Sequence, residues 1–412
     1  MSGLGKKIHL CNQSQCTGCM ACKQRCKANA ISVKNLNGFL YPEIDFRKCK
    51  SCGMCMDVCP ILNHQNKIGN CHKGATSVIA AWSKNPEIRM KSSSGGIFST
   101  IASNVLKKGG IVFGAAWQKD MRLAHVYIEC VEELDSLRRS KYVQSDIGES
   151  YSLTESFLRK GKSVLFCGTP CQIAGLRSFL KQSYDNLYTL DVLCQGVPSQ
   201  AIFQKYLAEY EALHKTKVID CNFRTKIRGW RCGLLLLLQT TKGKKYCFLN
   251  KNEYYNAFFK EFFMRESCYT CKFKEHDLGY FSDITVADFW RIGNKEKFDI
   301  SDYEKGVSAI IVNTDKGQSL LKECSDQLNM VDRKWSEFAT NGGLYCSKKP
   351  SRNDEALAYL CQHSWAETQK KYFPLGKKYF MQLRWLVFGE KNIRRLSRLK
   401  QMVKCLMRKI KT

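Results

Sequence analysis

Residues 16–26 read CTGCMACKQRC, and residues 49–59 read CKSCGMCMDVC. Both stretches carry four cysteines with the spacing Cys-x2-Cys-x2-Cys-x3-Cys, and Pro60 follows the second. This spacing is typical of chains that bind two 4Fe-4S clusters, because three thiolates on a tight loop hold three irons of one cubane and the fourth cysteine reaches the other cubane. A pair of zinc knuckles is the alternative, but zinc sites usually pair Cys-x2-Cys units across a longer loop. The expected ligand sets are Cys16, Cys19, Cys22 and Cys59 for one cluster, and Cys49, Cys52, Cys55 and Cys26 for the second.

The first 70 residues differ from the rest of the chain, because they are dense in cysteine and poor in apolar periodicity. Over about residues 8–62 they resemble the bacterial two-cluster ferredoxins, and all eight ligand positions match. The resemblance implies an α+β ferredoxin-like module that transfers single electrons and does no substrate chemistry. The catalytic part is therefore expected in a second domain, residues 71–345, and residues 346–412 are expected to form a helical C-terminal region.

The composition is that of a globular protein with two or three domains, since 44% of the 412 residues are hydrophobic and 25% are charged. The polar residues 1–15 lack the apolar stretch of a signal peptide, so we expect a cytoplasmic, reducing environment. The odd number of cysteines, 23, then favours metal or redox ligation over a disulfide scaffold. The apolar run at residues 234–238 is far shorter than the roughly 20 residues of a membrane-spanning helix.

Beyond residue 76, short apolar runs alternate with helical stretches, which predicts an α/β domain with a largely parallel sheet. The clearest units are a strand at residues 163–166 before a helix at 172–182, and a strand at 187–193 before a helix at 199–213. Crossover connections of this kind make the two strands parallel neighbours. Other expected elements are strands at residues 77–82, 233–240, 283–287 and 307–312, and an aromatic helix at 253–264.

Cysteines follow both of the clearest strands, in Cys167-Gly-Thr-Pro-Cys171 and in Cys194-Gln-Gly-Val-Pro198. Ligands of open α/β sheets bind beyond the carboxyl ends of the strands, so we expect these loops to meet at one edge. Cys268-Tyr-Thr-Cys271 supplies two more thiols. Four sulfurs from these segments could hold a third cluster or a zinc ion, and a redox-active dithiol is a further alternative.

Residues 92–98, SSSGGIF, precede a helical pattern that ends near Lys107. A serine cap followed by glycines allows backbone N–H groups to approach an anion at a helix N-terminus, although an ordinary helix cap has the same pattern. The chain contains neither GxGxxG nor GxxxxGKS/T, so neither a dinucleotide-binding fingerprint nor a P-loop is indicated.

Eight motifs, taken in order, resemble the coenzyme F-420 hydrogenase/dehydrogenase beta subunit family over about residues 8–330, in particular the bacterial members with an N-terminal ferredoxin module. The motifs are SSSGGIF at 92–98, KYVQS at 141–145, GTPCQ at 168–172, CQGVP at 194–198, Phe223-Arg224 with Gly229-Trp230, CYTC at 268–271, SDITVADFW at 282–290 and KGVS at 305–308. The resemblance implies an α/β flavoprotein that binds FAD beside a 4Fe-4S cluster.

The position of Cys167 is often serine in this family, so the resemblance assigns the third cluster to Cys171, Cys194, Cys268 and Cys271. The candidates for contact with the flavin are Ser94, Gly95, Gly96, Lys141 and Asp288. Lys141 and Asp288 are also the catalytic candidates, although Asp288 could simply cap the turn that follows its strand. The chain departs from the family pattern mainly around the substrate or deazaflavin pocket, at Arg139, Thr225, Gln195, Ala287 and Arg291, where the family often has Gly, Asp, His, Gly and Gly.

The net charge of +29 is partly localised, because residues 377–412 contain 12 Lys and Arg and one acidic residue, Glu390. Apolar residues recur there at three- and four-residue steps, which indicates a basic amphipathic helix suited to an anionic membrane surface, such as the inner face of the membrane, or to an acidic partner. A helix packed on its own protein is the alternative, and nucleic acid is the least favoured partner.

Together these features predict an oxidoreductase that passes electrons between ferredoxin-type clusters and FAD, with hydride transfer to or from a second substrate. That substrate would be coenzyme F-420 or an organic or glycan precursor. The alternative is an electron-transfer subunit without a substrate site of its own. Either function needs a redox partner, for which an acidic electron carrier or a catalytic subunit is expected.

Overall fold

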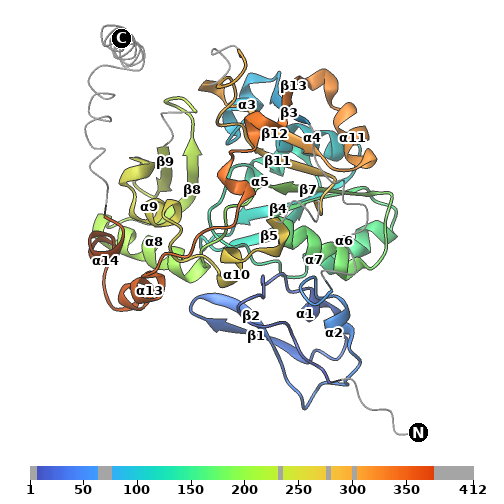
Figure 1. The fold of residues 1–412 in the computed structure, drawn as a ribbon, viewed down its shortest axis with the longest axis vertical. Coiled ribbons are helices and arrows are strands. Elements are labelled where there is room, and N and C mark those ends of the chain that lie inside the picture. The colour runs from blue at the N-terminus through green and yellow to red at the C-terminus, as the bar shows by residue number, and fades with distance from the viewer. Residues whose placement is uncertain (1–6, 64–76, 231–234, 275–279, 299–303, 375–412) are drawn as a thin grey trace, which may run out of the picture.

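The computed structural model describes residues 7–63, 77–230, 235–274, 280–298 and 304–374. Figure 1 shows a small N-terminal module, a central sheet with helices on both faces, and a third part made of a small sheet and several helices. No helix within these ranges is long and apolar enough to cross a bilayer. The predicted basic helix at residues 377–412 lies outside the described residues.

The N-terminal module contains an antiparallel hairpin and two short helices. The hairpin consists of β1 (Ile31–Leu36) and β2 (Phe39–Ile44), and its two-residue turn has φ angles of 52° at Asn37 and 83° at Gly38. Asn-Gly is the favoured sequence for such a turn because both residues must adopt positive φ. The helices are α1 (Ala21–Arg25) and α2 (Met54–Asp57).

The cysteine repeat in the sequence is also a repeat of backbone conformation. In the first copy, positive φ angles occur at Gly18 (71°) and Met20 (58°), two and four residues after Cys16. In the second copy they occur at the equivalent positions, Ser51 (53°) and Gly53 (76°). Both loops therefore turn in the same way before their helices begin.

The central sheet has eight strands, and four consecutive ones, from β11 to β4, run parallel. In spatial order they are β13 (Leu328–Lys334), β3 (Ser77–Ser83), β12 (Ser308–Val312), β11 (Ile284–Asp288), β7 (Leu187–Val192), β6 (Val164–Gly168), β4 (Ile111–Trp117) and β5 (Leu123–Ile128). The predicted neighbours β6 and β7 pair in parallel, as do β7 with β11 and β6 with β4. The flanking strands are antiparallel, so the sheet as a whole is mixed.

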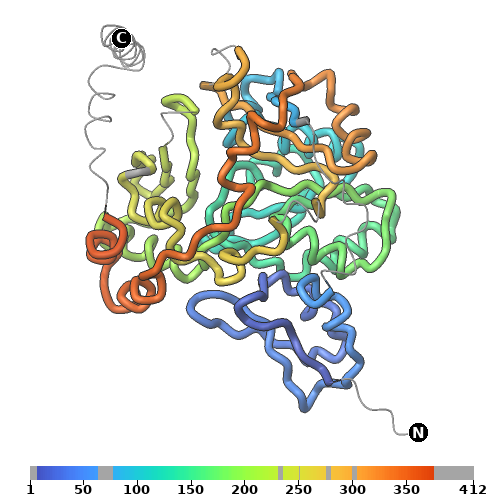
Figure 2. Tube along the Cα trace, viewed as in Figure 1, coloured from blue at the N-terminus to red at the C-terminus, as the bar shows by residue number. Residues whose placement is uncertain are grey.

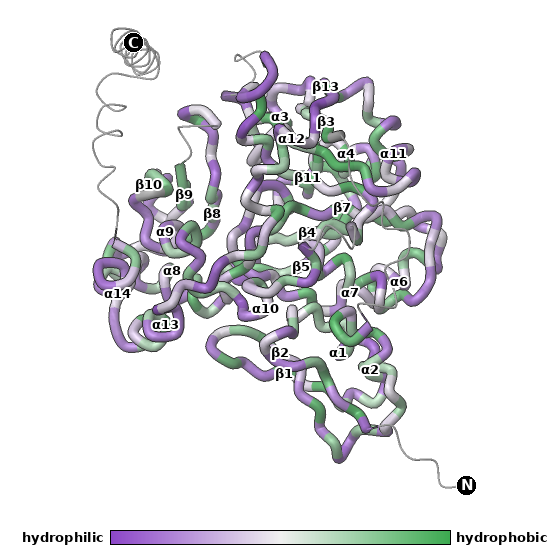
Figure 3. Tube along the Cα trace, in the orientation of Figure 1, coloured by the Kyte–Doolittle hydropathy of each residue, from purple (hydrophilic) through white to green (hydrophobic). Residues whose placement is uncertain are grey.

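Helices cover both faces of this sheet and bury its apolar side chains. Figure 3 shows hydrophobic residues along the sheet strands. On one face α4 (Ile97–Lys107), α5 (Leu134–Leu137) and α11 (Asp315–Lys322) pack against the strands. On the other face α6 (Ser150–Arg159) and α7 (Pro170–Leu180) do so, and Ala21 and Val58 of the N-terminal module join the same cluster. The module therefore shares a hydrophobic core with the sheet domain.

The third part is built on an antiparallel sheet in the order β10 (Gly243–Phe248), β9 (Leu235–Thr240) and β8 (Val218–Thr225). Its helices are α8 (Gln200–His214), α9 (Glu253–Phe259), α13 (Asn353–Gln362) and α14 (Trp365–Tyr372). The predicted aromatic helix ends at Phe259, five residues early, because Glu261 and Phe263 both adopt a φ of 62°. Tyr254, Tyr255 and Phe258 are buried, as a core stripe requires.

Three short helices complete the fold: α3 (Pro86–Lys91), α10 (Glu266–Tyr269) and α12 (Trp335–Phe338). The chain after α12 crosses from the central sheet to α13 (Figure 2). On its way Ser347 donates to the carbonyl oxygen of Gln195 at 2.5 Å, and the Cys346 thiol donates to that of Cys271 at 3.5 Å. This crossing segment therefore fixes two of the cysteine-bearing loops.

Asp283 joins the centre of the sheet to α11. Its carboxylate accepts hydrogen bonds from the backbone N–H and the hydroxyl of Thr189 at 2.8 and 2.6 Å, and from the Thr314 hydroxyl at 2.8 Å. Arg177 lies 3.4 Å from the same group, which is only 5% exposed. One buried carboxylate thus accepts from donors on strand β7 and at the N-cap of α11, and it also pairs with Arg177 on α7.

We expect Asp283→Ala to lower the free energy of unfolding by about 3–5 kcal/mol, because it leaves several buried donors and the Arg177 charge without their acceptor. Urea titration followed by circular dichroism measures this loss. Asp185→Ala, at an exposed position, is the matched control and should change the free energy of unfolding by no more than about 0.5 kcal/mol. Equal stability of the two variants would contradict the assignment of this role to Asp283.

Candidate functional site

The first thiol group consists of Cys16, Cys19, Cys22 and Cys59. Burial raises the pKa of Cys19 to about 12 and that of Cys22 above its usual value, and in both cases nearby negative charge on Cys16 and Cys59 adds to the rise. These interactions show that the last cysteine of the second repeat lies with the first three of the first repeat. The structure brings together the residues expected to hold one cluster.

The second thiol group consists of Cys26, Cys49, Cys52 and Cys55, which line one small hollow. Burial raises the pKa of Cys55, and the charges of Cys49 and Cys26 contribute to the same rise. Cys26 accepts a hydrogen bond from the Ala30 N–H at 3.3 Å, and Cys52 is exposed. The two repeats have therefore exchanged their fourth cysteines in space, as the spacing predicts.

The third thiol group consists of Cys171, Cys194, Cys268 and Cys271. Burial raises the pKa of Cys171 to about 12, and charge on Cys194 and Cys268 raises it further. The pKa of Cys271 is likewise raised to about 12, mainly by burial and then by Cys171. Cys167 differs, because apart from burial only Asp191 raises its pKa. The structure thus gathers the four predicted cysteines and leaves Cys167 outside the group.

The first and third thiol groups meet at α7. Cys171 is the second residue of this helix, and Gly175 stands one turn later. A Cβ atom on Gly175 would lie 2.8 Å from Cys19 Cβ and 3.1 Å from Cys19 Sγ. The charge of Cys19 also contributes to the raised pKa of Cys171. Of the two groups in the module, the first is therefore the one next to the sheet domain.

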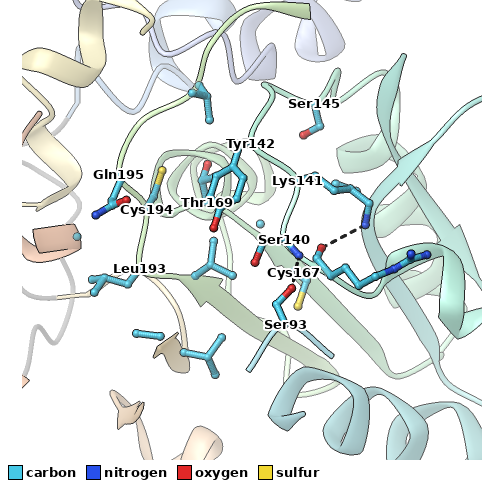
Figure 4. Close-up of a pocket in the computed structure, with 18 of the residues that line it drawn as sticks. Ser93, Ser140, Lys141, Tyr142, Ser145, Cys167, Thr169, Leu193, Cys194 and Gln195 are labelled. Atoms are coloured by element: carbon cyan, nitrogen blue, oxygen red, sulfur yellow. Dashed lines mark hydrogen bonds between the residues drawn. The ribbon is translucent and has the colours of Figure 1, made fainter. Parts of the chain in front are cut away.

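The third thiol group opens onto a cavity of about 580 Å³ beyond the carboxyl ends of β6 and β7 (Figure 4). All four of its cysteines line this cavity, together with Cys167. The rest of the wall comes from the Ser-Gly-Gly turn, the segment 139–145 and the end of β11. Its cationic side chains are Arg139, Lys141, Arg224 and Arg265, and its large aromatic ones are Phe98, Tyr142, Tyr255, Phe258, Phe259 and Trp290.

The Ser-Gly-Gly turn is held rigidly against the sheet. The Ser94 hydroxyl donates to the Val307 carbonyl at 2.9 Å, and the Gly95 N–H donates to Ser308 Oγ at 3.0 Å. A Cβ on Gly95 would lie 2.4 Å from the Ala81 carbonyl oxygen, so only glycine fits there. Gly96 has a φ of 92° and directly precedes α4, whose first residues line the cavity.

Lys226 also holds the Ser-Gly-Gly turn in place, through the backbone of Ser94. Its amino group donates to the carbonyl oxygens of Arg89, Ser94 and Lys305 at 2.5, 2.7 and 2.8 Å. Burial lowers the pKa of Lys226 to about 7. The three backbone carbonyls around this amine thus link the turn to the end of α3 and to the residues before β12.

Lys141 and Asp288 both line the cavity, but each already has partners in the protein. The Lys141 amino group donates to the carbonyl oxygens of Leu137 and Arg138 at 3.3 and 2.7 Å, at the end of α5 (Figure 4). Burial lowers its pKa to about 7. The Asp288 carboxylate forms a bidentate pair with Arg224, at 2.5 and 2.8 Å.

The departure at Arg139 has a visible consequence in the backbone. Arg139 lines the cavity with a φ of 76°, a conformation that glycine adopts without cost. Its guanidinium forms an ion pair with Asp220 at 3.1 Å. The chain therefore accepts a strained arginine where the family often has glycine.

Sequence reasoning missed Arg265, His125 and Cys11. Arg265 is buried between the module and the cavity, and no motif marks it. Burial lowers the pKa of His125 to about 4, and its neutral ring donates from Nε2 to the Cys167 carbonyl and accepts at Nδ1 from Ser145. Hydrogen bonds from Cys11 lower the pKa of Cys16 to about 6 and that of Cys59 to about 7. Only the spacing of Cys11, five residues before Cys16, could have drawn attention to it.

Three regions of the chain match family models. Residues 78–150 match the N-terminal region and residues 161–334 the C-terminal region of the coenzyme F-420 hydrogenase/dehydrogenase beta subunit. Residues 15–62 match a 4Fe-4S dicluster domain.

Two known proteins show partial similarity. A component of the ion-translocating oxidoreductase complex of Methanosarcina acetivorans is 41% identical over 56 residues, which is 14% of this chain and 20% of that protein. The chain thus spans about a fifth of the length of this relative. A chain in a xenon-derivatized F-420-reducing NiFe hydrogenase complex from Methanosarcina barkeri matches with a TM-score of 0.41 and 16% identity, over 71% of this chain and 90% of that one.

Lys141 predicts a pH dependence of stability. Its pKa of about 7 in the folded chain lies below that of an unfolded lysine, so the unfolded state binds more protons between pH 7 and 10, and stability rises with pH in this window. The loss of unfolding free energy caused by Lys141→Met should therefore be larger at pH 9 than at pH 7, by about 2 kcal/mol. Anaerobic urea titrations at both pH values measure it. For Lys242→Met, at an exposed turn, the loss should be the same at both pH values. A loss independent of pH for Lys141→Met would contradict the prediction.

Proposed function

Because the chain belongs to the coenzyme F-420 hydrogenase/dehydrogenase beta subunit family and carries a 4Fe-4S dicluster domain at its N-terminus, we propose that it is an iron–sulfur flavoprotein oxidoreductase. It exchanges electrons between one-electron carriers and a two-electron substrate. The three thiol groups are the proposed ligands of three 4Fe-4S clusters, and the cavity is the proposed site of FAD.

One observation carries this proposal: the third thiol group lies between the N-terminal module and the cavity. Its four cysteines line the cavity, and Cys19 of the first group contacts α7 beside Cys171. One-electron centres held by these cysteines would form a row that ends at the cavity. An electron-transfer enzyme needs such a row, whereas a zinc site or a lone dithiol does not.

The donor chemistry of the three groups fits iron–sulfur clusters. Each group supplies four thiols, and burial raises the pKa of six of these twelve above the usual range. Thiols in such surroundings stay protonated unless positive charge compensates them, and bound metal removes their protons. Iron in clusters held this way would exchange single electrons.

The cavity fits a flavin nucleotide in size and lining. Its volume of about 580 Å³ falls within the range of about 300–1,000 Å³ for cofactor pockets. Aromatic side chains suit a planar ring, and the start of α4 with the Arg139 guanidinium suits phosphates. A bound flavin would accept single electrons from the clusters and exchange pairs of electrons with the substrate.

The residues predicted to contact the flavin divide into two roles in this proposal. Gly96, at the start of α4, presents backbone N–H groups to an anion, and Ser94 and Gly95 give the turn its shape, because their own polar groups are bonded to β12 and the residue before it. Lys141 lies in the cavity wall, where the negative charge of a bound flavin phosphate would favour its protonated form. Asp288 holds Arg224 in the cavity wall. We propose that the substrate binds on this side of the cavity, where hydride transfer to or from coenzyme F-420 or an organic or glycan precursor would occur.

For the redox partner we propose an acidic electron-carrier protein that docks at the second thiol group. Cys52 is exposed there. The exposed Lys27 directly follows Cys26, and the exposed Lys48 and Lys50 flank Cys49. Lys50 lines the same hollow as the four cysteines. Within the described ranges neither Lys27 nor Lys50 forms an ion pair, so their charge is free to attract an acidic surface.

The cluster assignment predicts about 12 iron atoms and one FAD per chain in anaerobically purified protein, because each of three cubanes holds four irons. Cys268→Ala should lower the iron content by about four atoms. Cys221→Ala, which removes a buried thiol outside all three groups, should leave it unchanged. Iron and acid-labile sulfide analysis, with the visible spectrum, measure these values.

A wild-type content of about 8 iron atoms without flavin absorbance would contradict both the third cluster and the flavin. Three clusters without flavin would instead favour an electron-transfer subunit that serves a partner enzyme.

The docking surface predicts a charge-dependent rate. At low ionic strength, Lys27→Glu combined with Lys50→Glu should slow reduction by an acidic two-cluster ferredoxin about tenfold, because electrostatic steering is lost. Stopped-flow absorbance measures this rate. The matched control is Lys244→Glu with Lys245→Glu on β10, which should have little effect. Reduction by dithionite should be equal in all variants, and equal rates with the ferredoxin would contradict this docking site.

A further inference from the structure

Arg265 is a buried cation at the junction between the N-terminal module and the sheet domain. It directly precedes α10, which carries Cys268, and only 1% of its surface is exposed. Its Nε donates to the Cys16 carbonyl oxygen at 2.7 Å, and its Nη2 donates to the Leu40 carbonyl oxygen at 3.1 Å. Nη2 also lies 3.8 Å from Cys16 Sγ. The side chain thus reaches from the third thiol group to a member of the first.

The module is shaped to receive this guanidinium. A Cβ on Gly18 would lie 2.8 Å from Nη1, so any other residue there would displace the arginine. The Tyr41 and Phe39 rings lie on it, with centroids 4.1 and 5.5 Å from Cζ. Nη1 donates to Gln144 at 3.0 Å, and Gln144 in turn donates to the Thr17 carbonyl oxygen at 3.0 Å.

No carboxylate in the described part of the chain forms an ion pair with Arg265. The neighbouring Glu266 pairs with Lys349 instead, at 3.0 Å. A buried guanidinium is costly unless an opposite charge compensates it. The Cys16 sulfur lies 3.8 Å from the guanidinium, and the charge of a cluster held there would be the missing counter-charge.

We infer that Arg265 raises the reduction potential of the cluster in the first thiol group above that of the cluster in the second. Reduction adds one electron, and therefore one negative charge, to the cluster. A fixed positive charge close to a ligand sulfur stabilises the reduced form more than the oxidised form, and burial strengthens the effect. The inference rests on the proposed ligation of a cluster by Cys16.

The second thiol group has no such partner among the described residues. Its sulfurs face a backbone N–H at Cys26 and solvent at Cys52, and the exposed Lys50 is screened by water and salt. Electrons in the module would therefore collect on the cluster that faces Cys171 and the cavity. Arg265 also lines the cavity, but its proposed effect acts through the cluster held by Cys16, so it is a positioning residue.

Arg265→Met in the full-length protein tests this inference, because methionine removes the charge and keeps much of the packing. Redox titration followed by electron paramagnetic resonance reports each cluster separately. We expect at least a tenfold loss of electron occupancy on the first cluster at a fixed potential, which is about 59 mV for one electron. The second cluster should be unchanged.

Two further variants make the test decisive. Arg265→Lys keeps a charge but loses the forked contacts, so its shift should have the same direction and a smaller size. Lys181→Met removes a cation that crosses the same junction to Asp57 at 3.6 Å without a cysteine contact, and should shift neither cluster.

The iron content distinguishes failure of the proposed function from failure of the role of Arg265. If the wild type lacks the module's clusters, the proposed function fails. If iron is intact and neither Arg265→Met nor Arg265→Lys lowers the potential of the first cluster, the role of Arg265 is wrong. If Arg265→Met loses the cluster altogether, the direction of the shift in Arg265→Lys decides.

Discussion

The arrangement of the molecule depends on a close approach between Cys19 and α7 at Gly175. A side chain on Gly175 would meet Cys19 at 2.8 Å and the Tyr151 hydroxyl at 2.8 Å, so the module can rest on this helix only because the residue is glycine. On the module's side, Gly18 makes room for Arg265 in the same way. Glycine at both positions, Gly175 in the sheet domain and Gly18 in the module, therefore allows the first thiol group to lie directly beside the third. Together with the shared core around Ala21 and Val58, this contact gives the module's cysteines a fixed relation to the cavity.

The three thiol groups arise from different kinds of structure. The first two form from loops within residues 16–59, and each loop adopts the same pair of positive φ angles before its helix. The third group joins cysteines between residues 171 and 271, and it forms only once β6 and β7 are paired in parallel and α10 is packed. Parallel pairing brings the ends of both strands to one edge, where Cys171 and Cys194 follow. The cavity thus belongs to the folded sheet domain, whereas the module's groups depend mainly on local turns.

These differences explain how much the sequence could predict. The cysteine spacing predicted the two groups in the module, because each of these loops is formed by residues that are close in the sequence. Strand patterns located β6, β7 and the loops after them, although the antiparallel flanks of the sheet had no comparable signal. The early end of α9 followed from left-handed residues at Glu261 and Phe263, which carry no glycine signature. Arg265 could not be found from sequence, because its role comes from residues of the module more than 200 positions away, such as Cys16 at 249 positions.

The positions of the buried cations could not be predicted from the charge of the sequence. The net charge of +29 describes the surface and the C-terminal residues, and it gives no sign of which few cations build the interior. Lys226 and Lys141 are surrounded by backbone carbonyls, and Arg224 is paired with Asp288, so these three are neutralised or solvated by the protein itself. Arg265 has carbonyls and rings around it but no carboxylate among the described residues. A buried cation that the protein leaves without a counter-ion marks the place where the charge of a bound group completes the structure.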